Sequence, residues 1–131
     1  MLNTAKITFY GGTGSVTGAN FLLEIDGKKI LVDCGLTQGE KLADDINWDP
    51  FVYDPKTIDI LFVTHGHVDH LGRIPKLISE GFRGKIYSTE PTKGLATPML
   101  EDTAGILSKN TELGLNKIYT PENIKDRKSV V

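Results

Sequence analysis

All three histidines of the chain fall within the six-residue run HGHVDH at 65–70, and an aspartate stands among them. His65 and His67, two residues apart on an extended segment, point to the same side and can share one metal ion. Asp69 and His70 follow as the chain turns into a predicted helix, so they face a neighbouring position. Neutral imidazole and carboxylate are ligands that suit zinc. The run therefore predicts a zinc site.

This donor set predicts hydrolytic chemistry. Two zinc ions roughly 3.5–4 Å apart can share a bridging water and lower its pKa toward about 7. Hydroxide then exists at neutral pH and can attack a phosphodiester, an ester or an amide. Asp69 is placed to bind one ion and to accept a proton from the nucleophile, which makes it the candidate catalytic residue. The alternative, surface-loop histidines before an ordinary helix start, explains the clustering less well.

The elements that must position the run follow an α/β pattern. An opening β-meander precedes an alternation of strand, helix, strand and helix, which indicates a mixed sheet with flanking helices. A hairpin turn at Asp26-Gly27 joins the second and third strands. The predicted strands are 6–10, 20–25, 28–32, 57–64 and 85–88, and the predicted helices are 70–80 and 91–108.

Three of these elements carry specific expectations. The segment 57–64 is almost continuously apolar, which predicts a central strand buried on both faces that delivers the histidine run at its C-terminal end. The helix 70–80 should stop at Gly81. The helix 91–108 contains Pro98, which should kink or break it. Along one face of this helix lie Leu95, Met99, Thr103 and Ile106.

Two connecting segments come before the histidine run. The glycine-rich loop 11–18 lacks the G-x-G-x-x-G spacing and leads into a strand rather than a helix, so we expect turns with positive φ rather than a nucleotide site. In the long loop 35–56, Trp48 and Phe51 are expected to cover the sheet. Cys34 is interpreted as a small buried residue rather than a nucleophile.

Other polar residues leave two interpretations open. Asp33, at the end of a hairpin arm, could orient a metal-bearing loop or could cap backbone N–H groups in a turn. Arg73 and Lys76, together with Arg83 and Lys85, could form a rim that attracts phosphate and contacts RNA. A solvated helix face is the better-supported interpretation of these four residues.

Composition narrows the class of protein. The 131 residues are enough for one domain, with 39% hydrophobic and 24% charged residues and a formal net charge of -2. That charge gives no general attraction to nucleic acid. A single cysteine excludes an internal disulfide, and we expect neither a signal peptide nor a membrane span, so a cytoplasmic protein is predicted. Residues 109–131 form a polar tail.

The stretches GGTGSVTGANFLLEIDGKKILVDCGLTQGE and THGHVDHLGRIP, with GFRGKIYST and LATPMLEDTAGI, resemble the metallo-β-lactamase superfamily. They resemble in particular its β-CASP branch of RNA-processing nucleases, which includes ribonuclease J and the nuclease of mRNA 3′-end cleavage. The resemblance implies an αββα sandwich, of which this chain would supply the N-terminal part. It also implies RNA phosphodiester hydrolysis with two zinc ions, one held by His65 and His67 and one by Asp69 and His70. Asp33 matches a buried supporting aspartate.

The remaining ligands of that family, two histidines and a bridging aspartate, have no counterpart after His70. We therefore expect residues 1–131 to be the N-terminal part of a longer enzyme, which alone binds zinc weakly and hydrolyses little. Half a sandwich would leave a sheet face uncovered, which predicts aggregation, a homo-oligomer or association within an RNA-processing complex. Two alternatives stay open: a small-molecule ester or thioester hydrolase, and a non-catalytic scaffold that binds RNA or protein.

Overall fold

The chain begins with an antiparallel meander of three strands, β1 (Lys6–Gly11), β2 (Asn20–Ile25) and β3 (Lys28–Val32). Asp26 and Gly27 turn the β2–β3 hairpin with φ of 48° and 73°, the left-handed pair that a two-residue hairpin loop requires. These elements agree with the predicted strands to within one residue. The computed structural model describes residues 4–39, 46–107, 118 and 129–130.

The second half of the sheet is parallel. β4 (Ile60–Phe62) pairs with β3, β5 (Lys85–Tyr87) pairs with β4, and β6 (Ser129–Val130) pairs with β5. The order of the strands in the sheet follows their order in the sequence from β1 to β6. Each connection between parallel strands therefore joins two strands that are neighbours in the sheet. The predicted mixed sheet is confirmed. Apart from β6 and Ile118, the predicted polar tail lies outside the described residues.

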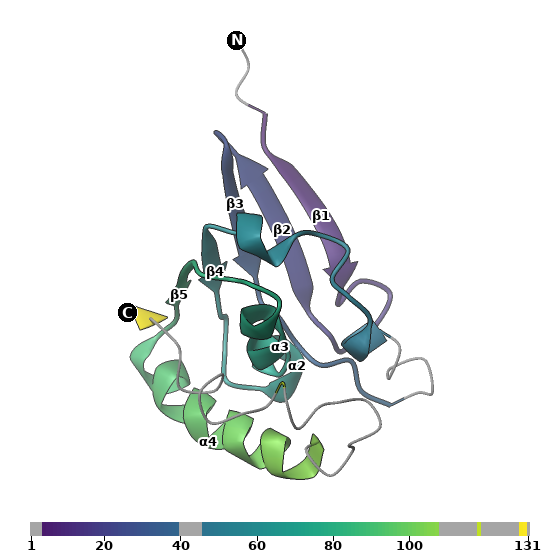
Figure 1. Cartoon of the computed structure of the whole chain (residues 1–131), viewed down its shortest axis with the longest axis vertical. Coiled ribbons are helices and arrows are strands. Elements are labelled where there is room, and N and C mark those ends of the chain that lie inside the picture. The colour runs from purple at the N-terminus through teal and green to yellow at the C-terminus, as the bar shows by residue number, and fades with distance from the viewer. Residues whose placement is uncertain (1–3, 40–45, 108–117, 119–128, 131) are drawn as a thin grey trace.

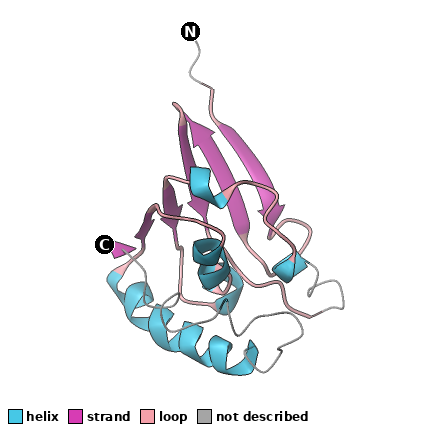
Figure 2. Ribbon diagram, viewed as in Figure 1, coloured by secondary structure: helices cyan, strands magenta, loops and turns pink. Residues whose placement is uncertain are grey.

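Helices and one long connection cover one face of this sheet (Figures 1 and 2). The 3₁₀ helix η1 (Pro55–Thr57) precedes β4, while α2 (Val68–Leu71) and α3 (Ile74–Ser79) lie between β4 and β5. The long helix α4 (Glu90–Leu107) follows β5 and contacts α2. Alternate strand residues point into the core beneath these helices: Leu22, Leu31, Leu61 and Ile86.

The prediction of a strand over 57–64 was too long. Pro55 opens η1 and the Asp54 carboxylate caps it, so the extended segment starts later. At the other end, the Thr64 N–H donates to the Asp33 carboxylate, which ends the ladder. The expected burial on both faces was also wrong, because Phe62 is 43% exposed.

The single helix predicted over 70–80 is two helices. The Arg73 N–H donates to Cys34 O at 2.9 Å, and Asp69 O, its partner in a continuous helix, accepts from Ala19 N at 3.0 Å. Pro75 has no N–H for the carbonyl four residues earlier. Both features interrupt the ladder between α2 and α3. The predicted stop is confirmed, with Gly81 at a φ of 110°.

In α4 the expected break at Pro98 was wrong, and of the predicted stripe Thr103 is buried and Met99 partly buried. Pro98 lies inside the helix without ending it. Leu95 is 56% exposed and Ile106 is 64% exposed. The buried side chains are mostly small, which lets the helix approach its neighbours closely: Thr92, Ala96, Leu100, Thr103 and Ala104.

The sheet face opposite the helices carries a row of apolar side chains across five strands. The register aligns Phe9, Phe21, Val32, Phe62 and Tyr87. Ring pairs at 5.6 Å (Phe9 and Phe21) and 5.4 Å (Phe62 and Tyr87) lie within this row. Phe9 is 56% exposed, so the row is accessible to another apolar surface.

We expect the 131-residue chain to self-associate through this face. Phe62→Thr should weaken the association with little loss of folded stability, because the side chain is already partly in water. The matched change Leu61→Ala, one residue earlier on the buried face, should cost about 2–5 kcal/mol of stability instead. Sedimentation across a concentration series measures the first effect and thermal unfolding the second. A wild-type chain that stays monomeric at every concentration would contradict this expectation.

Candidate metal centre

The predicted ligands lie together where β4 ends and α2 begins. The ring centroids of His65 and His67 are 4.7 Å apart, and those of His65 and His70 are 3.9 Å apart. Nε2 of His70 lies 3.3 Å from Oδ2 of Asp69. His67 is exposed and the other three side chains are half-buried, so the group opens to solvent on one side.

Beneath these rings lies the carboxylate of Asp33, which is 1% exposed. Its Oδ1 accepts the Thr64 N–H at 2.8 Å, and its Oδ2 accepts the Thr64 hydroxyl at 2.7 Å. Oδ2 also lies 2.7 Å from Nδ1 of His70. Of the two roles left open by the sequence, this geometry favours orientation of the metal-bearing loop.

These contacts determine which nitrogen of each ring faces outward. A carboxylate accepts hydrogen bonds, so the contact with Asp33 engages Nδ1 of His70 as the donor and leaves Nε2 as the other ring nitrogen. The Thr64 hydroxyl donates to Asp33 and lies 3.0 Å from Nδ1 of His65, from which it therefore accepts. Both imidazoles thus present Nε2 as a potential ligand atom, the arrangement that a carboxylate–histidine–metal contact needs.

The donor set has the chemistry that a metal ion requires, although the described residues do not form a complete cage. Nε2 of His70 and the Asp69 carboxylate lie 3.3 Å apart, close enough to bind one cation together. Among the described residues, no group of three or more such side chains is already arranged to hold an ion. Two ligands for each ion is fewer than the three protein ligands usual in catalytic zinc sites.

Backbone hydrogen bonds join the segment after β3 to the metal-bearing loop. Cys34 N donates to His70 O at 2.8 Å, and Leu36 N donates to Val68 O at 3.0 Å. Gly35 lies between them, and a Cβ at this position would meet the Asp69 carbonyl oxygen at 1.6 Å. Only a residue without a side chain lets the two backbones lie this close. This explains why the sequence VDCG ends in glycine.

A second set of buried polar groups fixes the backbone of Asp33. The Asn20 amide donates to Asp33 O at 2.9 Å, and the Tyr53 hydroxyl donates to the Asn20 carbonyl oxygen at 3.0 Å. Burial raises the pKa of Tyr53, so the phenol keeps its proton and acts as a donor. These contacts hold Asp33 at a φ of 60°, which is unusual for a residue other than glycine.

The predicted RNA-contacting rim was wrong for Arg73 and Lys76, and so was the alternative of a solvated helix face. Arg73 is 4% exposed, and its side chain donates to the carbonyls of Gly35 and Ile46. Lys76 is 1% exposed, and its ammonium contacts Asp49 O at 2.7 Å and the Glu80 carboxylate at 2.8 Å. Both cations hold the long loop against α3.

The loop residues behave as expected. Trp48 and Phe51 are partly buried against the core, which confirms that they cover the helical face of the sheet. Phe51 also lies under the two buried cations, with the Lys76 ammonium 3.7 Å from its ring centroid. Cys34 is fully buried, and burial raises the pKa of its thiol to about 11, which excludes a thiolate nucleophile at neutral pH.

Sequence reasoning missed Thr64, Asn20 and Tyr53. Thr64 directly precedes the histidine run at the end of a strand, and that position was the available signal. Asn20 interrupts an apolar strand pattern at its first residue, and a buried polar residue of this kind usually has a specific partner. Tyr53 had no local signal, since its partner lies 33 residues away along the chain.

Comparison with known proteins identifies the family. Residues 14–121 match the Metallo-beta-lactamase superfamily. The chain belongs to this superfamily. It is 37% identical over 121 residues to ribonuclease TTHA0252 of Thermus thermophilus, covering 92% of this chain and 26% of the relative. This metallo-β-lactamase-fold chain is also 35% identical to the transcription termination factor FttA of Methanosarcina mazei, covering 79% of this chain and 16% of that protein.

A third relative is the cleavage and polyadenylation specificity factor 73 of Drosophila melanogaster, 33% identical over 87% of this chain and 16% of the relative. The names of these relatives agree with the RNA-processing branch that the sequence resembles. The chain thus spans about a quarter or less of the length of these proteins.

Solved structures confirm the fold. The metallo-β-lactamase fold protein YhfI from Bacillus subtilis superposes with a TM-score of 0.53 at 18% identity, over 74% of this chain and 41% of that one. A metallo-β-lactamase from Cronobacter sakazakii gives 0.51 at 17% identity, over 70% and 32%. The described sheet and its helical layer therefore correspond to part of the predicted αββα sandwich.

Gly35→Ala should displace the Asp69 carbonyl and destabilise the loop that carries the predicted ligands. We expect a loss of about 1–3 kcal/mol or more, the range for overpacking a tight site. Gly94→Ala is the matched control, because a Cβ on that helical glycine meets nothing within 4 Å. It should be neutral or should raise stability by up to about 1 kcal/mol. Denaturant unfolding compares the two, and equal stabilities would refute the argument.

Thr64→Val keeps the shape of the side chain but removes the hydroxyl that links Asp33 to His65. Loss of such an outer contact typically weakens metal binding by about 10–100-fold. We expect a fall of that size in zinc affinity, measured by calorimetric titration, with Thr64→Ser close to wild type. Metal-free thermal unfolding of both variants separates misfolding from lost ligand orientation. A valine variant that binds zinc as tightly as wild type would show that the hydroxyl does not act on the ligands.

Proposed function

We propose that this chain is the N-terminal part of a zinc-dependent ribonuclease that hydrolyses RNA phosphodiester bonds. The observation that carries the proposal is the buried Asp33, which contacts Nδ1 of His70 directly and reaches Nδ1 of His65 through the Thr64 hydroxyl, so that Nε2 of each ring is left for a metal ion at the solvent-open face of the group. The 37% identity to a protein named as a ribonuclease supports RNA as the substrate class.

In this proposal two zinc ions bind at that face, one held by His65 and His67 and one by Asp69 and His70. When bound, the ions would lower the pKa of a coordinated water and stabilise negative charge on the phosphoryl oxygens. The carboxylate of Asp69 would accept a proton at an Oδ atom during the attack. Asp33 and Thr64 would keep the rings of His65 and His70 in the required tautomers throughout.

The activity proposed is that of the whole protein. The chain spans 26% of ribonuclease TTHA0252, and we expect the remaining ligands and the RNA cleft to come from outside these 131 residues. Residues 1–131 alone should bind zinc weakly and cleave little RNA. A cytoplasmic location and membership of a homo-oligomer or an RNA-processing complex stay predictions. None of the described helices combines the length and apolar character that a membrane span requires.

The direct test is cleavage of 5′-labelled single-stranded RNA by the longest natural product that contains this segment. His67→Ala is the informative variant, because His67 is exposed and makes no side-chain capping bond to α2. Zinc-dependent shortening of the RNA that a chelator abolishes is expected for wild type, and His67→Ala should lower the rate by at least about 100-fold. Lys28→Ala, an exposed change in the β2–β3 hairpin, should leave the rate unchanged.

The outcome separates the proposal from its alternatives. Intact RNA with zinc bound would contradict a ribonuclease, and turnover of small esters or thioesters by the same sample would then support that class of hydrolase. A scaffold would show neither reaction, and His67→Ala would keep its biological activity. The pattern of labelled products also distinguishes endonucleolytic from 5′-to-3′ exonucleolytic cleavage.

A further inference from the structure

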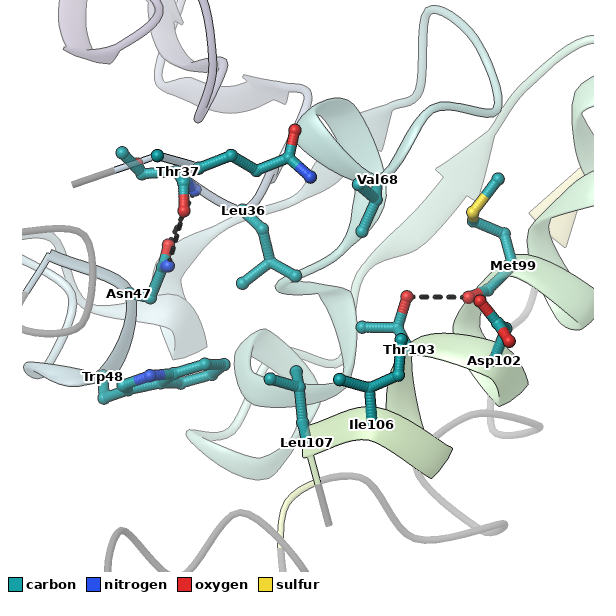
Figure 3. Close-up of a pocket in the computed structure, with 12 residues that line it drawn as sticks. Leu36, Thr37, Asn47, Trp48, Val68, Met99, Asp102, Thr103, Ile106 and Leu107 are labelled. Atoms are coloured by element: carbon teal, nitrogen blue, oxygen red, sulfur yellow. Dashed lines mark hydrogen bonds between the residues drawn. The ribbon is translucent and has the colours of Figure 1, made fainter. Parts of the chain in front are cut away.

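A pocket of about 480 Å³ lies beside the candidate metal centre, between the segment after β3 and the C-terminal half of α4. Figure 3 shows the Trp48 indole on one side of this space and Met99 with Asp102 on the other. Val68 also lines it. Val68 is the first residue of α2, so the pocket lies against the start of the helix that carries Asp69 and His70.

The lining suits a flat aromatic ring. Trp48, Met99 and Ile106 provide apolar and aromatic surface, and the volume lies in the range usual for small-molecule sites. Nucleic-acid bases stack on aromatic side chains such as the Trp48 indole. Among the lining residues that the structure describes there is no Lys or Arg, and the charged side chain is Asp102, whose carboxylate disfavours a phosphate group.

The polar groups of the lining point to a particular base. The Asn47 side chain is already used, since it donates to Thr37 O and accepts from Thr37 N, both at 2.8 Å. The Thr103 hydroxyl donates to Met99 O at 2.8 Å. The Asp102 carboxylate therefore supplies the charged acceptor, and it can accept two N–H groups at once. Guanine offers two adjacent donors, N1–H and N2–H₂, on one edge.

We propose that this pocket binds a nucleobase of the RNA next to the cleaved phosphate, and that Asp102 makes guanine the preferred base. The proposal rests on the ribonuclease function proposed above, because it assigns a base-binding subsite to the same centre. It also gives a role to the apolar side chain of Ile106, which is 64% exposed and lines the pocket together with Met99.

Trp48 provides the measurement, since it is the single tryptophan of the chain and lines the pocket. Its fluorescence is followed while guanosine, adenosine, cytidine, uridine or ribose 5-phosphate is titrated into the 131-residue chain, with excitation at the red edge of tryptophan absorption. We expect saturable quenching by guanosine, weaker binding of the other nucleosides and no response to ribose 5-phosphate. Equal responses to all four nucleosides, or no response to any, would overturn the proposal.

Asp102→Asn tests the specificity. A hydrogen bond to a charged group contributes about 1.5–3 kcal/mol, so guanosine affinity should fall by about tenfold or more while adenosine affinity changes little. Glu101→Gln is the matched control, because Glu101 is an exposed acid on the same helix that does not line the pocket. It should bind guanosine as wild type does. An unchanged guanosine preference in Asp102→Asn would refute the role of Asp102.

The two proposals fail separately. Quenching needs no metal, so it should persist in the presence of chelator and in His67→Ala, where RNA cleavage is lost. Cleavage of RNA by the longer protein without any nucleoside binding here would overturn the pocket alone. Guanosine binding without zinc-dependent cleavage would overturn the ribonuclease, and with it the placement of the base beside a cleaved phosphate.

Discussion

The buried carboxylate of Asp33 is the interaction on which the candidate centre depends. β3 and β4 are parallel neighbours, so their C-terminal ends meet at one edge of the sheet, and there Asp33 lies beside Thr64. A carboxylate that is 1% exposed requires several donors to offset its lost hydration. It finds them in the Thr64 backbone, the Thr64 hydroxyl and the His70 ring. The same bonds that satisfy Asp33 therefore orient the predicted ligands.

The surroundings of Asp33 leave the metal-bearing loop little freedom. On one side, the backbone of this loop is hydrogen-bonded to the segment that follows β3. The two backbones lie so close together that only glycine fits at position 35. On the other side, Arg73 and Lys76 hold the long loop that carries Asn47 and Trp48. Two cations that sequence reasoning placed at the surface thus position one wall of the proposed base pocket.

The two faces of the sheet differ in completeness. The helical face has a closed core, whereas the opposite face presents an apolar row from Phe9 to Tyr87. The candidate centre is incomplete as well, since the described residues contain no group of three or more donors arranged to hold a metal ion. Both observations concern a chain that spans 26% of a ribonuclease relative, and both agree with the proposal that further ligands and a second sheet come from outside it.

The sequence alone determined the local features: the HGHVDH run, the hairpin at Asp26-Gly27 and the strands on either side of it. These depend on neighbouring residues, because turn geometry and alternation are properties of short segments. It could not show that Thr64 links Asp33 to two histidines, or that Lys76 is buried, because those partners lie far apart in the chain. Only the tertiary structure decided which face of α4 packs inward, since periodicity shows that a helix has a face but not what that face will meet.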